Sequence, residues 1–110
     1  MRGTISIGNK DVEMAANAAT PFVYKQTFHE DLLLQLQAKE PSSDLVVKLG
    51  FVMAKQAELP AAELMKIKET EFYSWVEQFE FMDFVGVSKD IFDLYTYQTV
   101  RTSVPKNEGV

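Results

Sequence analysis

The spacing of apolar residues changes once along this chain, at Thr20-Pro21, and that change limits the possible folds more than any other feature. Upstream of it, residues 4–7 and 12–14 alternate polar and apolar side chains, and Gly8-Asn9-Lys10-Asp11 between them supplies turn residues. Alternation with a period of two on both sides of a turn predicts a β-hairpin near residues 3–15. The apolar positions fall on one face: Ile5, Ile7, Val12 and Met14. Because an isolated two-stranded hairpin is marginal in water, this face should pack against helices.

Helical spacing begins at Thr20-Pro21. Thr20 is suited to be an N-cap, and Pro21 suits the first helical position, where its missing N–H is not needed. Apolar residues then recur every four positions, as on one face of a helix: Tyr24, Phe28 and Leu32. We expect an exposed histidine at a break, His29, and a second helix over about residues 30–37.

Further capped segments with helical spacing follow. We expect a helix over about residues 44–57, a short helical turn after Pro60, a helix capped by Thr70, and a last helix capped by Ser88. Residues 81–86 are expected to form a connection. Four aromatic and aliphatic residues have the spacing of a core-facing stripe: Phe72, Trp75, Val76 and Phe79. Three methionines are expected in the core: Met14, Met53 and Met65.

The fold class that follows is α+β and mainly α-helical, with an N-terminal β-hairpin and about five helices. A chain of 110 residues fits one domain, which we expect over residues 1–101. Residues 102–110 are polar and rich in helix breakers, and we expect a flexible C-terminal tail there.

Composition excludes several classes of function. The formal net charge of −5 argues against binding to nucleic acid phosphates or anionic membranes, because both need clustered lysine and arginine. With one histidine and no cysteine, neither a two-histidine metal site nor a thiolate metal site can form. No phosphate-binding glycine loop or calcium loop occurs in the sequence. We therefore expect no enzymatic activity and no catalytic, cofactor-binding or metal site.

Aromatic and apolar residues remain after the helical stripes are filled, and these are the candidates for contact with a partner protein. Four residues are predicted to form this surface: Tyr73, Phe81, Met82 and Phe84. The other reading of clustered aromatics is a buried core, which we expect for the stripe that contains Trp75. The acidic residues read as solvated helix faces, with some near helix starts, where the helix dipole favours them.

The order of these motifs resembles a known family. Residues 19–33 read A-T-P-F-x-Y-K-x-x-F-x-x-D-L-L, and Glu71–Phe79, Ile91–Tyr95 and Gln98–Ser103 follow in order. This arrangement is similar to the tail assembly chaperones of long-tailed, siphovirus-type bacteriophages and prophages, mostly those of Gram-positive hosts. The similarity covers most of the chain, and it rests on the order of helical residue patterns rather than on invariant catalytic residues. One departure is His29, which stands where glycine is common in that family.

The resemblance implies a non-enzymatic role in tail morphogenesis. Proteins of this family bind the tape measure protein, keep its apolar helices soluble and help to recruit tail tube subunits. The implied location is the host bacterial cytoplasm, and the protein is not expected in the mature virion. We also expect homo-oligomers, since many copies would coat an extended partner better than one. The family often makes a longer form by a ribosomal frameshift, so we expect a slippery codon run near Lys106-Asn107.

A second class of function stays open. A small acidic phage or bacterial regulator could inhibit a partner by occupying its basic site, and the net charge of −5 fits that role as well. Gene order would separate the two, because a tail protein gene upstream and a very long tape measure gene downstream support the chaperone.

Overall fold

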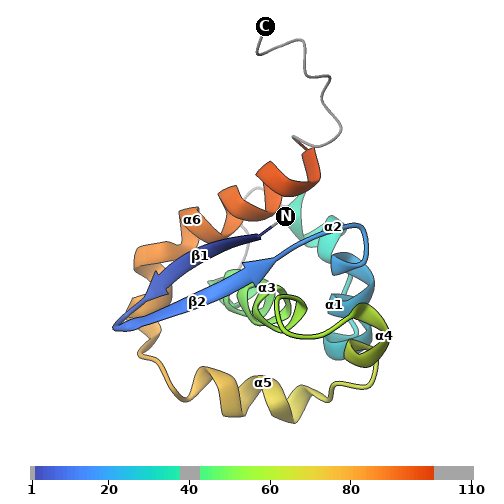
Figure 1. The fold of residues 1–110 in the computed structure, drawn as a ribbon, viewed down its shortest axis with the longest axis horizontal. Coiled ribbons are helices and arrows are strands. Elements are labelled where there is room, and N and C mark those ends of the chain that lie inside the picture. Colours follow the sequence, from blue (N-terminus) through green and yellow to red (C-terminus); the bar gives the residue numbers. More distant parts are fainter. Residues whose placement is uncertain (1, 38–42, 101–110) are drawn as a thin grey trace, which may run out of the picture.

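The computed structural model describes residues 2–37 and 43–100, and it consists of a two-stranded antiparallel hairpin followed by six helices (Figure 1). This confirms the predicted α+β, mainly α-helical class. The predicted tail at 102–110 and the Lys106-Asn107 site lie outside the described residues.

The hairpin joins β1 (Arg2–Ile7) to β2 (Lys10–Ala15) through the two-residue turn Gly8-Asn9. Gly8 has a φ of 63°, a conformation that L side chains rarely adopt, and glycine is the usual residue at the first position of such turns. The predicted apolar face is confirmed, because Ile5, Ile7 and Met14 are buried and Val12 is partly buried.

Helix α1 (Thr20–Phe28) begins one residue earlier than predicted, with Ala19 as its N-cap. Thr20 is not the N-cap because its hydroxyl is used elsewhere: it accepts from the Asn17 N–H (3.0 Å) and donates to Gln56 Oε1 (2.5 Å). The predicted break at His29 is confirmed. This exposed residue has a left-handed φ of 59°, and its N–H donates to the Lys25 carbonyl, which closes α1.

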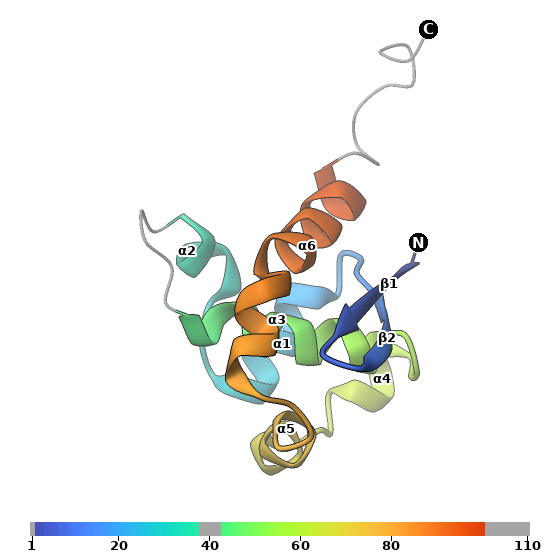
Figure 2. The same ribbon diagram turned by 90° about the vertical axis from the view of Figure 1, so that its left-hand side faces the viewer.

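Helix α2 (Leu32–Leu36) is a short helix that starts after the break. The Asp31 carboxylate accepts the Leu34 N–H at 3.1 Å and caps it. Helix α3 (Ser43–Gln56) is the centre of the fold: it packs on β2, α1, α5 and α6 (Figure 2). Apolar residues occupy nearly every side of this helix, so it can be buried on most of its surface. Its buried apolar residues are Leu45, Val46, Val47, Leu49, Phe51, Val52, Met53 and Ala54.

Helix α4 (Ala61–Leu64) is the short helical turn predicted after Pro60. The next two helices start earlier than predicted. Helix α5 (Glu69–Val76) begins before Thr70, with Lys68 at the N-cap, and the Lys68 N–H donates to the Glu71 carboxylate at 3.4 Å. Helix α6 (Phe81–Val100) includes the segment expected to be a connection.

The early start of α6 has a local cause. The Asp83 carboxylate accepts the Glu80 N–H at 3.0 Å, which caps the helix eight residues before Ser88, the expected cap. Ser88 instead lies inside α6, where its hydroxyl donates to the Val85 carbonyl at 3.2 Å. Gly86 lies inside α6 and does not end the helix. A Cβ atom added at Gly86 would have no neighbouring atom within 4 Å, so no close contact requires glycine there.

Two expectations about the core also need correction. Met14 and Met53 are fully buried, but Met65 is exposed, because it follows the short α4, whose fully buried residue is Leu64. In the predicted stripe Phe72 is buried, whereas Trp75, Val76 and Phe79 are partly buried and pack against the edge of the core.

Candidate partner-binding surface

Three of the four residues predicted for partner contact are exposed and the fourth is buried. Tyr73, Phe81 and Met82 have 54%, 55% and 70% of their surface exposed, and Phe84 has 1%. The prediction that Phe84 lies on the contact surface is therefore wrong.

Phe84 is buried because α5 and α6 meet around it. Its ring centroid lies 5.6 Å from that of Trp75 and 5.3 Å from that of Phe79, both from the end of α5 or the connection that follows it. The preceding residues Phe81 and Met82 point elsewhere, since successive side chains of a helix diverge around its axis.

The first turn of α6 nevertheless carries an apolar surface. Val85, which is 47% exposed, follows Phe81 by four residues and therefore lies on the same side of the helix. We name Phe81, Met82 and Val85 the α6 patch. Exposed Glu77 and Glu80 precede it in the chain, so the surroundings of the patch include negative charge. Tyr73 belongs to α5, where its ring packs 5.2 Å from that of Phe72.

A second apolar surface was missed by the sequence analysis. Phe22 on α1 is 67% exposed, and Met65, after α4, is 39% exposed. Both line a shallow groove of about 400 Å³ together with Lys25, Gln26 and His29, and we name it the α1–α4 groove. The signal was present in the sequence, because Phe22 falls off the four-residue spacing that begins at Tyr24.

A third set of exposed apolar side chains lies on α2. Leu32 is fully buried, whereas Leu33 and Leu34 are about half and two thirds exposed. Three leucines in a row cannot all face the core from one helix, so the run itself indicated that some would be exposed.

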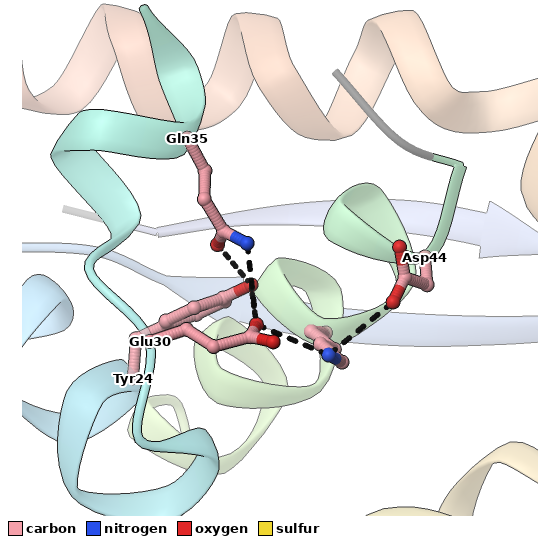
Figure 3. A network of polar contacts seen from close by, with 5 residues as sticks. Tyr24, Glu30, Gln35 and Asp44 are labelled. Atoms are coloured by element: carbon pink, nitrogen blue, oxygen red, sulfur yellow. Dashed lines mark hydrogen bonds and ion pairs between the residues drawn. The ribbon is translucent and has the colours of Figure 1, made fainter. Parts of the chain in front are cut away.

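A network of polar contacts fixes α2 against α1 and α3 (Figure 3). The Tyr24 hydroxyl donates to Gln35 Oε1 at 2.9 Å, and Gln35 Nε2 donates to Glu30 Oε1 at 3.3 Å. Lys48 of α3 lies 3.1 Å from the same Glu30 oxygen and 3.3 Å from Asp44 Oδ2. The exposed leucines of α2 are therefore presented by a helix that is held in a defined position.

The network also changes proton affinities. Burial raises the pKa of Tyr24 well above its usual value, and the negative charges of Glu30 and Asp44 raise it further. For Lys48, partial burial acts to lower the pKa, but hydrogen bonds to Glu30 and Asp44 outweigh it, and the pKa is raised. At neutral pH the network thus holds a protonated phenol and a charged ammonium.

Among residues 2–37 and 43–100, no group of three or more histidine and carboxylate side chains is placed to hold a metal ion. Within the same ranges, no helix is both long enough and apolar enough to span a bilayer. Comparisons of the chain with models of protein families, with curated proteins and with solved structures find no match.

Proposed function

We propose that this protein is a phage tail assembly chaperone that binds the tape measure protein during tail morphogenesis. The observation that carries the proposal is the exposure of large apolar side chains on three separate parts of a small acidic domain. They are the α6 patch, the α1–α4 groove and the leucines of α2. Large exposed apolar groups on a small domain mark protein contact sites, and the motif order of residues 19–33 supports the choice of partner.

The physical basis of this chaperone activity is burial of apolar helix faces. A tape measure helix that exposes an apolar stripe loses contact with water when it lies against Phe81, Met82 and Val85. The net charge of −5 keeps the complex soluble, because like-charged complexes repel one another. Tail tube subunits are a second partner, and several copies of the chaperone associate along the extended partner in the host cytoplasm.

Co-expression with the tape measure gene of the same phage tests the proposal. The wild-type protein should raise the soluble fraction of the tape measure protein and co-purify with it. The double variant Phe81→Ser/Met82→Ser should lose most of this effect, whereas the control Gln78→Ser, at an exposed polar site, should keep it. Wild-type protein that neither solubilises nor co-purifies with the tape measure protein would contradict the proposal.

The alternative function is that of an acidic inhibitor of a basic site. The salt dependence of partner affinity distinguishes this inhibitor from the chaperone. Apolar contacts should change in affinity by less than roughly threefold between about 0.1 and 0.5 M NaCl, because salt screens charges but does not weaken apolar burial. An inhibitor that binds through its carboxylates should lose affinity steeply over the same range.

A further inference from the structure

The outer edge of β1 has backbone groups without a strand partner. Across the two-residue turn, Ile7 pairs with Lys10, so Ile7 and Ile5 direct their N–H and C=O groups toward β2. The alternate residues, Thr4 and Ser6, direct theirs away from β2. Within residues 2–37 and 43–100, no backbone hydrogen bond joins β1 to any element other than β2. Such an edge can accept a further strand.

Strand β1 and helix α6 lie side by side (Figure 1), and a groove is lined by residues of both elements. It has a volume of about 840 Å³, and it is lined by residues 3–6 of β1 and by Asp90, Asp93, Leu94 and Thr96 of α6. At one position the strand and helix are in close contact: a Cβ added to Gly3 would lie 2.8 Å from Leu94 Cδ1. The groove is therefore bounded by strand backbone on one side and by helix side chains on the other.

The helix side of the groove is acidic. Asp90 and Asp93 are three residues apart, which places both carboxylates on the same side of α6. Lys89 lies 2.6 Å from Asp93, but both side chains are largely exposed, so water competes with this pair and an incoming cation can replace it. Within the described residues Asp90 makes no ion pair.

We propose that the β1 edge binds an extended segment of a partner protein as a third strand, with lysine or arginine side chains of that segment facing Asp90 and Asp93. The free N–H and C=O groups of Thr4 and Ser6 require an extended backbone, and the carboxylates select basic side chains. A second copy of this chain fits less well, because pairing two β1 edges would bring two acidic α6 walls together. The inference does not depend on the proposed function.

Hydrogen exchange with a model peptide tests the mode of binding. The probe is a peptide of alternating lysine and valine, and the control is the same peptide with glutamate in place of lysine. On adding the lysine peptide to the full chain, the amides of Thr4 and Ser6 should exchange at least tenfold more slowly, while those of Ile5 and Ile7 change less. The glutamate peptide should leave all four amides unchanged.

Variants of the protein separate the backbone from the charge contribution. Thr4→Pro removes an outward N–H without removing a β1–β2 hydrogen bond and should weaken peptide binding about tenfold. Thr4→Val, which keeps the N–H, should change it less than twofold. Asp90→Asn/Asp93→Asn should weaken binding at least fivefold, against less than twofold for Glu77→Gln/Glu80→Gln, which removes the same charge elsewhere.

The peptide itself keeps the proposal falsifiable if Thr4→Pro does not fold. In a strand, the N–H groups of every second residue face a given neighbour. Methylating the peptide nitrogens that face β1 should abolish binding to the wild-type protein. Methylating the alternate nitrogens, which face away from β1, should leave binding intact. Equal effects of both sets, absence of binding by the lysine peptide, or protection of Thr4 and Ser6 through self-association alone would each overturn the proposal.

Discussion

The two halves of α3 are joined to their neighbours by different chemistry. In the N-terminal half, Lys48 and Asp44 take part in the polar network with Glu30 that holds α1 and α2. In the C-terminal half, Phe51 contacts the rings of Phe72 and Trp75, whose centroids lie 5.5 and 5.6 Å away, and these rings hold α5.

The difference shows how the same helix presents two kinds of surface. Hydrogen bonds have narrow angular preferences, so the polar network fixes the direction in which α2 points its exposed leucines. Aromatic rings pack with broader freedom, and Trp75 and Phe79 remain partly exposed where they pack against Phe84. We therefore expect the aromatic side to dominate the free energy of unfolding and the polar side to define geometry.

The largest effect is expected from Phe51→Ala. Phe51 is 1% exposed and contacts rings of both α1 and α5, so its loss leaves a cavity between them. The free energy of unfolding should fall by about 3–5 kcal/mol in urea denaturation followed by far-UV circular dichroism. A loss below about 1 kcal/mol would show that the rings do not hold α5 on α3.

A matched pair on α6 sharpens the aromatic side of the comparison. Phe84→Ala should cost about 3 kcal/mol, because this ring is enclosed by Trp75 and Phe79. Phe81→Ala removes an equal volume from an exposed site and should change the free energy of unfolding by about 0.5 kcal/mol or less. Equal losses for the two variants, measured in the same urea titration, would contradict the burial of Phe84.

A pair of lysines tests the polar side. The Lys48 side chain is 14% exposed and bridges two carboxylates, whereas the Lys89 side chain is 86% exposed and pairs with Asp93 alone. Lys48→Met should lower the free energy of unfolding by about 1–2 kcal/mol. Lys89→Met should leave the urea midpoint unchanged within error, since exposed ion pairs contribute little. A larger effect at Lys89 would reverse the expected order.

Among the substitutions of well-buried side chains, Tyr24→Phe should have the smallest effect, and its effect depends on pH. At pH 7 the variant should lose about 1 kcal/mol, the value of one hydrogen bond. The pKa values of Tyr24 and Lys48 are raised in the folded protein, so the stability that their protonation adds is complete below the unfolded values, near 10 and 10.5. That stability is lost as the pH rises through the folded pKa values.

Wild-type stability should therefore fall as the pH rises above about 10, and Tyr24→Phe should fall less steeply over the same range. Urea titrations between pH 8 and pH 11 measure both slopes, and absorbance at 295 nm follows tyrosine ionisation directly. Parallel curves for the two proteins would show that Tyr24 does not contribute to the alkaline loss.

Local signals in the sequence predicted the main architecture. Alternation on both sides of Gly8-Asn9-Lys10-Asp11 predicted the hairpin and its buried face, and both are confirmed, with Gly8-Asn9 alone as the turn. The break at His29 was also predicted from the sequence, and it is confirmed. The early start of α6 was not predicted, because its cap is the side chain of Asp83, inside a segment whose glycine suggested a connection. Gly86 is a weak helix former, but the Asp83 cap and the packing of α6 on the core stabilise the helix more than Gly86 destabilises it.

The sequence alone determined which residues share a face, since the periods of strands and helices follow from backbone geometry. It therefore determined the hairpin, the helical class and the presence of apolar residues in excess of one core. Tertiary structure decided which of those residues are covered. Phe84 is buried because Trp75 and Phe79 pack against it, while Phe22 and Met65 stay exposed because no described element lies over them. Burial depends on contacts between elements distant in the chain, and the spacing within one element does not specify them.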